Sequence, residues 1–272
     1  ECHVDGVYID QVAAAAPAPC YDSTHGHPVG GGHYWTVDGY WPLMERVRRA
    51  LPEGKFLTTE CNAEPYAHLF DSYLTWHWQQ QDAIPLFPAV YGCQIGMFGR
   101  SYGAGPDRAL ATRMKAAQQL VFGEQIGWIG PDVIDRPDEG PFVRQAVRIR
   151  RALHDYIVDG EMAHPPVVVG DVPTVTADWQ WSGKWIVTTD ALLTGSWRAR
   201  DGRLVAIFAN VSDAPISVTW RFDGAAQGLK GPRLVVARRT ETDVSESLTD
   251  LRFDRPLTVE PRQVVAFELR DQ

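Results

Sequence analysis

The sequence lacks several features that mark common classes of protein. It contains no run of lysine and arginine and its net charge is −8, which argues against a surface for nucleic acid or anionic lipid. No apolar run is long enough to span a bilayer, and no signal peptide is recognisable. Internal repeats and low-complexity tracts are also absent. We therefore expect neither a nucleic-acid partner nor a membrane partner.

Cysteine is scarce and follows no metal-binding pattern. The 4 cysteines, Cys2, Cys20, Cys61 and Cys93, show no CxxC spacing, so free thiols are predicted rather than a structural zinc site. No metal and no cofactor is expected. The first residue is Glu1 instead of methionine. We interpret this as a sequence that begins partway along a longer protein. Any targeting segment would then be missing, and the localisation stays unknown.

The composition is that of a globular protein rich in aromatic residues. The chain has 272 residues, of which 44% are hydrophobic and 22% charged, values ordinary for one large domain or two smaller ones. Its 10 tryptophans and 9 tyrosines are unusual. Aromatic faces stack on sugar rings, and they also fill hydrophobic cores. Composition alone leaves both interpretations open.

Two short runs near the start each end on an acidic residue. GVYIDQV carries Asp10 and KFLTTECNAE carries Glu60, and a helical pattern at 39–51 lies between them. In a (β/α) barrel the active site lies at the C-terminal ends of the strands. Two carboxylates placed on neighbouring strands in this way are the minimum equipment for cleaving a glycosidic bond.

Residues 1–160 alternate strand and helix patterns throughout. Further strands are predicted at 73–76, 86–91 and 123–129, and further helices at 64–71, 107–121 and 141–158. Five β/α units correspond to the C-terminal part of a (β/α)8 TIM barrel, whose missing N-terminal half is expected in a parent protein. An open doubly wound parallel sheet is the alternative, although no glycine-rich phosphate turn follows any strand.

The remainder of the chain predicts an all-β domain. Residues 161–183 are rich in proline and are predicted to be a linker, and residues 184–272 are predicted to be a β-sandwich. Alternating runs occur at 185–189, 192–198, 204–210, 216–222, 234–238 and 264–269. Turn dipeptides such as Asp201-Gly202 and Asp223-Gly224 separate several of these runs.

Asp10 and Glu60 are the predicted catalytic residues, and two nearby acids compete with them. Asp5 precedes its strand and so lies at the wrong end of a barrel for chemistry. Glu64 opens a helical segment, where its charge favours the positive end of the helix dipole. The structural alternative for Asp10 and Glu60 is a helix cap or a loop carboxylate.

Other residues are predicted to line a sugar pocket. A glycine-rich loop at 20–35 holds His25, His27 and His33; its His-x-His pattern suggests a metal, but a substrate-lining role is the favoured interpretation. Trp76 and Trp78 are predicted sugar platforms, with packing at the barrel rim as the alternative. The other predicted substrate-binding residues are Tyr8, His33, Asn62, His77, Gln79 and Gln125.

Four segments in order carry a family resemblance: GVYIDQ, LTTECNAEPY, LTWHWQ and LVFGEQIGW. Together they resemble a group of uncharacterised bacterial glycosidase-like proteins, in which a TIM barrel precedes a β-sandwich. That group is similar at a distance to the endo-α-N-acetylgalactosaminidases. The resemblance implies a nucleophile after the fourth barrel strand and an acid/base after the fifth, which correspond to Asp10 and Glu60. It leaves the sugar and the linkage open.

The sequence therefore predicts a retaining glycoside hydrolase that acts by double displacement on a carbohydrate substrate. Asp10 would attack the anomeric carbon, and Glu60 would protonate the leaving oxygen and later deprotonate water. A non-catalytic carbohydrate-binding or scaffold protein is the alternative. An inverting hydrolase is a third possibility, expected if the carboxyl groups are about 6.5–9.5 Å apart.

Overall fold

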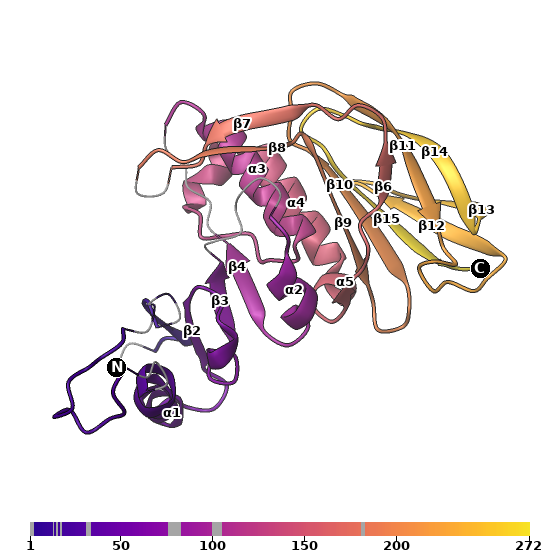
Figure 1. The fold of residues 1–272 in the computed structure, drawn as a ribbon. Helices are drawn as coiled ribbons and strands as arrows, with labels where there is room; N and C mark the ends of the chain where they lie inside the picture. Colours follow the sequence, from indigo (N-terminus) through magenta and orange to yellow (C-terminus); the bar gives the residue numbers. More distant parts are fainter. Residues whose placement is uncertain are drawn as a thin grey trace. The chain divides into compact units, whose positions relative to one another are not determined.

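The computed structural model describes residues 3–12, 14, 16, 18–30, 34–75, 83–99, 105–180 and 183–272 (Figure 1). The chain divides into two compact units. The first comprises residues 1–77 and 95–97, and the second comprises residues 78–94 and 98–272. Each unit is described by itself below.

A parallel sheet organises the N-terminal part of the chain. Its strands are β1 (Gly6–Ile9), β2 (Phe56–Glu60), β3 (Ser72–Thr75) and β4 (Gly96–Gly99), in the order β1-β2-β3-β4. Strands β1 and β2 pair in parallel, as do β2 and β3. The connections carry a π-helix η1 (Tyr34–Tyr40), helix α1 (Trp41–Ala50) and a 3-10 turn η2 (Glu64–Tyr66). This β/α segment confirms the prediction of a partial barrel.

One face of this sheet is covered and the other is open. Along β2, Leu57 and Thr59 are fully buried, whereas Phe56, on the opposite face, is 57% exposed. Tyr8 pairs with Thr58 on the same face as Phe56 and is 36% exposed. A closed barrel would bury this apolar face. The described strands therefore match the predicted partial barrel with an exposed apolar face.

An arginine of helix α1 bonds the β2–β3 connection. The Arg48 guanidinium donates to the Leu69 carbonyl and to Asp71 Oδ2, both at 2.9 Å. The same Asp71 oxygen accepts the backbone N–H of Leu57 at 2.7 Å, which ties the helix to β2. Sequence analysis predicted this helix at 39–51. Its first residues instead belong to the π-helix.

The middle of the predicted barrel differs from expectation. Residues 86–91, predicted as a strand, form helix α2 (Leu86–Tyr91); Pro88 is tolerated there because the first turn of a helix leaves its N–H groups without intrahelical partners. Strand β4 was missed because it is bounded by Gly96 and Gly99. In the predicted strand 123–129, the described pairing is one parallel bridge between Phe98 and Gln125.

The second unit begins its regular structure with helices. These are α3 (Arg108–Val121), η3 (Pro131–Asp135), α4 (Gly140–Ala152) and α5 (His154–Ile157). Helix α3 agrees with the prediction at 107–121. The helix predicted at 141–158 is present but is broken into α4 and α5. The break falls at Leu153, whose backbone angles of φ −99° and ψ 22° leave the helical region.

Antiparallel strands complete the second unit. Its six-stranded sheet has the order β13-β12-β15-β10-β9-β5, its three-stranded sheet the order β14-β11-β6, and its hairpin pairs β7 with β8. The strands are β5 (Glu161–Met162), β6 (Val167–Val169), β7 (Thr174–Asp178), β8 (Ile186–Asp190), β9 (Leu192–Arg198), β10 (Leu204–Asn210), β11 (Ile216–Asp223), β12 (Arg233–Arg239), β13 (Val244–Asp250), β14 (Arg252–Val259) and β15 (Val264–Asp271). This arrangement confirms the predicted sandwich.

The centre of the larger sheet is buried on both faces. Val205 and Ile207 of β10 pack with helices α3, α4 and α5 in one cluster, and Ala206 and Phe208 pack against the smaller sheet in a second cluster. Every residue of β10 is accordingly buried. A strand covered on both faces is a continuous apolar run instead of an alternating one. The helices that cover one face are visible in Figure 1.

The segment 161–183, predicted to be a linker, carries strands of its own. Strand β5 pairs with β9, β6 with β11 and β7 with β8. Its extended, proline-rich chain therefore contributes to three different sheets. The domain boundaries at 160 and 184 stay predictions.

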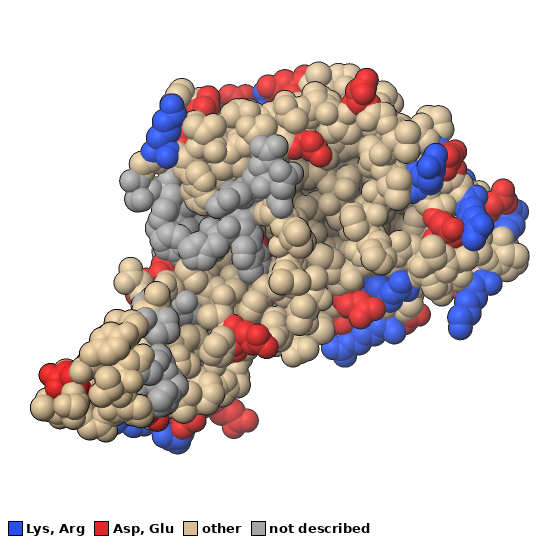
Figure 2. Space-filling view, viewed as in Figure 1, with Lys and Arg blue, Asp and Glu red and all other residues tan. Residues whose placement is uncertain are grey.

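The charges on the surface are mixed in sign. On the face drawn in Figure 2, acidic and basic side chains alternate over the described residues without forming a large basic patch. Among the described helices, none combines the length and the hydropathy that crossing a bilayer requires.

A lysine lies in the core of the second unit. Lys115 of α3 is 1% exposed, and its Nζ donates to the Trp179 carbonyl at 2.6 Å. Burial lowers the pKa of this amine to about 7, and the nearby Asp178 carboxylate opposes the shift. The folded chain therefore favours the neutral amine at a pH where the unfolded chain still holds the proton.

We expect this lysine to make the unfolding free energy depend on pH. Between pH 7 and the ordinary lysine value of 10.5 the unfolded state binds the additional proton, so stability rises as the pH rises through that window. Lys115→Met should abolish this part of the slope in urea unfolding at pH 7 and 9.5. The exposed Lys184→Met is the control and should keep the wild-type slope. Equal slopes in all three proteins would contradict the assignment.

Candidate functional site

The two predicted catalytic carboxylates occupy neighbouring positions at the end of the parallel sheet. Strands β1 and β2 pair in register, with Ile9 opposite Thr59. Asp10 directly follows Ile9, and Glu60 directly follows Thr59. Both acids therefore lie at the C-terminal ends of adjacent strands. Neighbouring strands are about 4.8 Å apart, so side chains at equivalent positions on the two strands are neighbours.

The two carboxylates differ in their surroundings. Asp10 is exposed, whereas Glu60 is only 3% exposed. Glu60 pairs with Leu74 of β3, and the following amide of Cys61 donates to the Leu74 carbonyl at 2.9 Å. Glu60 is therefore paired with β3 on one side, whereas Asp10 follows the end of β1, the edge strand of the sheet.

Both carboxylates are followed by a residue in left-handed backbone. Gln11 has φ 60° and Cys61 has φ 58°, and among the described residues only three other non-glycine residues, His3, Gln180 and Arg262, have positive φ. This conformation costs about 1–2 kcal/mol for a residue with a Cβ. Such strain persists where the surrounding structure enforces it, and it concentrates at functional sites.

The loop after β2 presents a polar group to the same end of the sheet. Asn62 is partly buried, and its Nδ2 has no hydrogen-bond partner among the described residues. The next residue is fixed, because the Tyr73 hydroxyl donates to the Ala63 carbonyl at 3.0 Å. Burial raises the pKa of Tyr73, an effect that Tyr66 reinforces, so the phenol stays a donor. An amide anchored in this way can bind a substrate hydroxyl.

Sequence reasoning missed an aromatic group beside this loop. The ring of Tyr40 lies 5.6 Å from Trp35 and 6.1 Å from Tyr66, and the hydroxyls of Thr36 and Tyr66 are 3.3 Å apart. The buried Trp35 Nε1 has no partner among the described residues. Trp35 and Tyr40 belong to the π-helix, a rare structure that is frequent at functional sites. The sequence of residues 34–40 contains no feature that would predict a π-helix instead of an ordinary α-helix.

The structure also places the two competing acids. Asp5 lies at the other end of β1, where Oδ1 accepts a hydrogen bond from Lys55 Nζ at 2.6 Å. Glu64 opens η2, and its carbonyl accepts the Ala67 amide at 3.0 Å. Neither residue lies at the paired strand ends.

The remaining predicted site residues are distributed as follows. Tyr8 lies on β1, two residues before Asp10, on the open face of the sheet. Gln125 belongs to the second unit, is exposed, and accepts the Gly99 amide through its carbonyl at 3.2 Å. The other predicted residues lie outside the described part of the chain: His33, Trp76, His77, Trp78 and Gln79.

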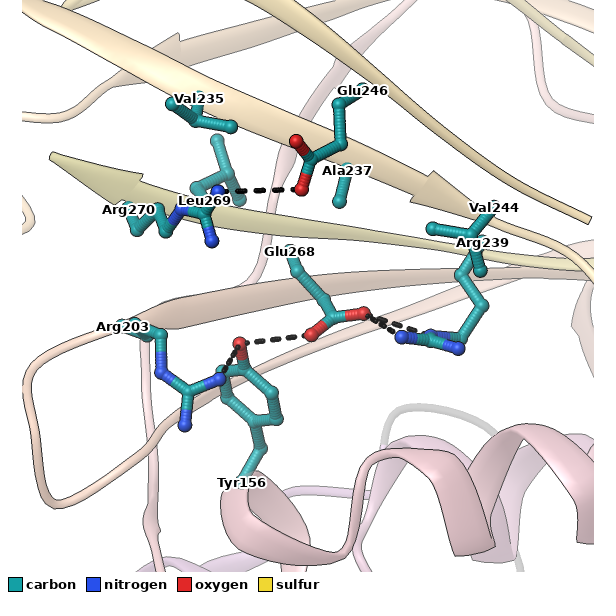
Figure 3. Close-up of a pocket in the computed structure, with 10 residues that line it drawn as sticks. All are labelled: Tyr156, Arg203, Val235, Ala237, Arg239, Val244, Glu246, Glu268, Leu269 and Arg270. Carbon is teal, nitrogen blue, oxygen red and sulfur yellow. Dashed lines mark hydrogen bonds and ion pairs between the residues drawn. The ribbon is translucent and has the colours of Figure 1, made fainter. Parts of the chain in front are cut away.

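A separate cavity lies in the second unit, against β12, β13 and β15 (Figure 3). Its volume is about 210 Å³. Glu268 accepts Arg239 Nε at 2.8 Å and the Tyr156 hydroxyl at 3.1 Å, and Arg203 Nη1 donates to the same hydroxyl at 3.2 Å. Burial, with the neighbouring Glu268 carboxylate, raises the pKa of Tyr156. These side chains hydrogen-bond to one another, and the bonds of Tyr156 join helix α5 to the sheet.

Comparison with known proteins points to the glycoside hydrolases. A family model described as a domain of unknown function, DUF6259, matches residues 1–102. A protein of Bacteroides thetaiotaomicron named "Putative glycoside hydrolase" is 31% identical over 80% of this chain. A similarly named protein of Monosiga brevicollis is 38% identical over 48% of it. The chain spans only 33% and 12% of the lengths of these two relatives.

Solved structures agree with the fold. A β-L-arabinopyranosidase of Geobacillus stearothermophilus aligns with a TM-score of 0.51 at 11% identity, over 99% of this chain and 59% of that one. An α-amylase of Anoxybacillus aligns with a TM-score of 0.50 at 10% identity, over 99% of this chain and 59% of that one. The chain thus has the barrel-and-sandwich fold of known glycosidases, and its sequence is similar to proteins named as members of that class.

Proposed function

We propose that this chain carries the catalytic pair of a retaining glycoside hydrolase, with Asp10 as nucleophile and Glu60 as acid/base. The observation that supports this most is the register of β1 and β2, which gives the two carboxylates equivalent positions on adjacent strands. The left-handed residues after each acid add to it. The similarity to two proteins named as glycoside hydrolases supports the reaction class.

In the first step Asp10 attacks the anomeric carbon while Glu60 protonates the departing oxygen. In the second step Glu60 removes a proton from water, which displaces Asp10 from the covalent intermediate. For this work the Glu60 carboxyl has to lie within hydrogen-bond reach of the glycosidic oxygen. Asn62 would bind a sugar hydroxyl, and Tyr8 would contact the substrate from β1. His33, Trp76, His77, Trp78, Gln79 and Gln125 stay proposed pocket residues.

The substrate is proposed only as a carbohydrate with an O-glycosidic bond. A screen of aryl α- and β-glycosides, including N-acetylgalactosaminides, should find at least one that is hydrolysed. The protein should be expressed from its complete reading frame, because the four parallel strands that the structure describes do not close a barrel. Proton NMR of the first product should show the anomeric configuration of the substrate. Inversion would instead assign Asp10 as a general base, and binding of sugars without turnover would favour a carbohydrate-binding protein.

A further inference from the structure

The loop after β1 brings together three side chains that can ligate a metal. Cys20, His25 and His27 each offer one sulfur or nitrogen atom, and these atoms all lie within 4.8 Å of one another. Cys20 Sγ is 3.3 Å from His25 Nδ1. The Gly30 amide donates to the Cys20 carbonyl at 2.6 Å and closes the loop around the group. All these residues belong to the first unit.

The two histidines are oriented through their outer nitrogens. His25 Nε2 lies 3.2 Å from Asp22 Oδ2, and the other carboxylate oxygen accepts the amide and the hydroxyl of Thr24 at 2.8 and 2.6 Å. His27 Nδ1 is 3.0 Å from the Pro28 carbonyl. A carbonyl oxygen only accepts, so Nδ1 of His27 is the donor in this contact, and Nε2 is the nitrogen that can bind a metal. Metal-binding histidines are typically held in this manner, by a carboxylate or a carbonyl.

We propose that Cys20, His25 and His27 bind one Zn²⁺ ion, with Asp22 orienting His25. Thiolate and imidazole are donors that zinc prefers over magnesium or calcium. Zinc–ligand bonds of about 2.3 Å to sulfur and about 2.05 Å to nitrogen at a tetrahedral angle separate the two donors by about 3.6 Å. The observed 3.3 Å between Cys20 and His25 needs only a small adjustment. Three protein ligands leave a fourth position for water.

The sequence did not predict this site, because the spacing of Cys20 from the histidines is not a common zinc motif. The loop folds back on itself and so brings Cys20 next to the two histidines. Its proposed role is to fix the segment that follows Asp10 and leads into the π-helix. A thiol that merely donates a hydrogen bond to His25, with no metal, is the competing explanation for the same geometry.

Metal binding by the 272-residue chain distinguishes the two explanations. After removal of metal with a chelator, the reduced chain should take up one Zn²⁺ or one Co²⁺. The Co²⁺ form should show a thiolate-to-metal charge-transfer band in the near ultraviolet. Cys20→Ser should abolish that band, and His25→Gln and His27→Gln should each weaken Zn²⁺ binding at least 100-fold. Asp22→Asn should weaken it about 10–100-fold, as expected for a group that orients a ligand.

Matched controls keep the test independent of hydrolysis. Cys93→Ser removes another thiol and His164→Gln an exposed histidine, and both variants should bind metal like the wild type. Circular dichroism checks the folding of every variant. A charge-transfer band that survives Cys20→Ser, or a Zn²⁺ affinity of the wild type no higher than that of His27→Gln, would overturn the zinc site. Since the readout is binding, the result stands whether or not the glycosidase proposal holds.

Discussion

Asp10→Asn is expected to lower kcat for glycoside hydrolysis by more than about 10³-fold, because the amide cannot displace the leaving group. The substitution preserves size, and Asp10 is exposed, so the unfolding free energy should change by no more than about 0.5 kcal/mol. Thermal unfolding followed by circular dichroism checks the second statement. Steady-state kinetics on the substrate found by the screen check the first.

Asp5→Asn is the matched control, since Asp5 lies on the same segment at the opposite end of β1 and pairs with Lys55. It should lose some stability and little activity. Asp10→Ala with azide adds a chemical test. Azide should enter from the face that the carboxylate vacates and give a glycosyl azide of inverted configuration. Full activity of Asp10→Asn, or an azide product of retained configuration, would remove Asp10 from the role of nucleophile.

The sequence predicted best those parts of the fold that are buried on a regular pattern. Strands β9 and β10 lie where they were expected, because their apolar runs are bounded by clear turns. Strands β13 and β14 were missed, since β13 is almost entirely exposed and carries little apolar pattern. The prediction of a strand at 86–91, where the structure has helix α2, was wrong because a short apolar run fits either a strand or a helix.

The candidate site was predictable in part. The position of Asp10 and Glu60 after short β-branched runs indicated neighbouring strand ends, and the observed register agrees. The left-handed turns were not predictable, because glycine normally signals them and here the residues are Gln11 and Cys61. The meeting of Cys20 with His25 likewise depends on a loop conformation that no local spacing encodes.

Glu60→Ala is expected to slow hydrolysis most for substrates whose leaving group has to be protonated as it departs. For an alkyl glycoside, kcat/KM should fall about 10²–10⁴-fold, the usual contribution of general acid catalysis. For a dinitrophenyl glycoside, whose leaving group departs as an anion, kcat/KM should change little. The covalent intermediate then accumulates, because the second step has lost its base. A burst of dinitrophenolate followed by slow turnover would show this.

Added azide provides the decisive measurement for Glu60. In Glu60→Ala it should accelerate the second step and give a glycosyl azide of retained configuration, the opposite of the product expected from Asp10→Ala. Because Glu60 is buried, Glu60→Gln serves as a variant of equal size that keeps the packing and loses the acid. Glu64→Ala is the matched control and should behave like the wild type on both substrates. Equal losses on both substrates in Glu60→Ala, without azide rescue, would take the acid/base role from Glu60 and favour Glu64, the other acid of the loop that follows β2.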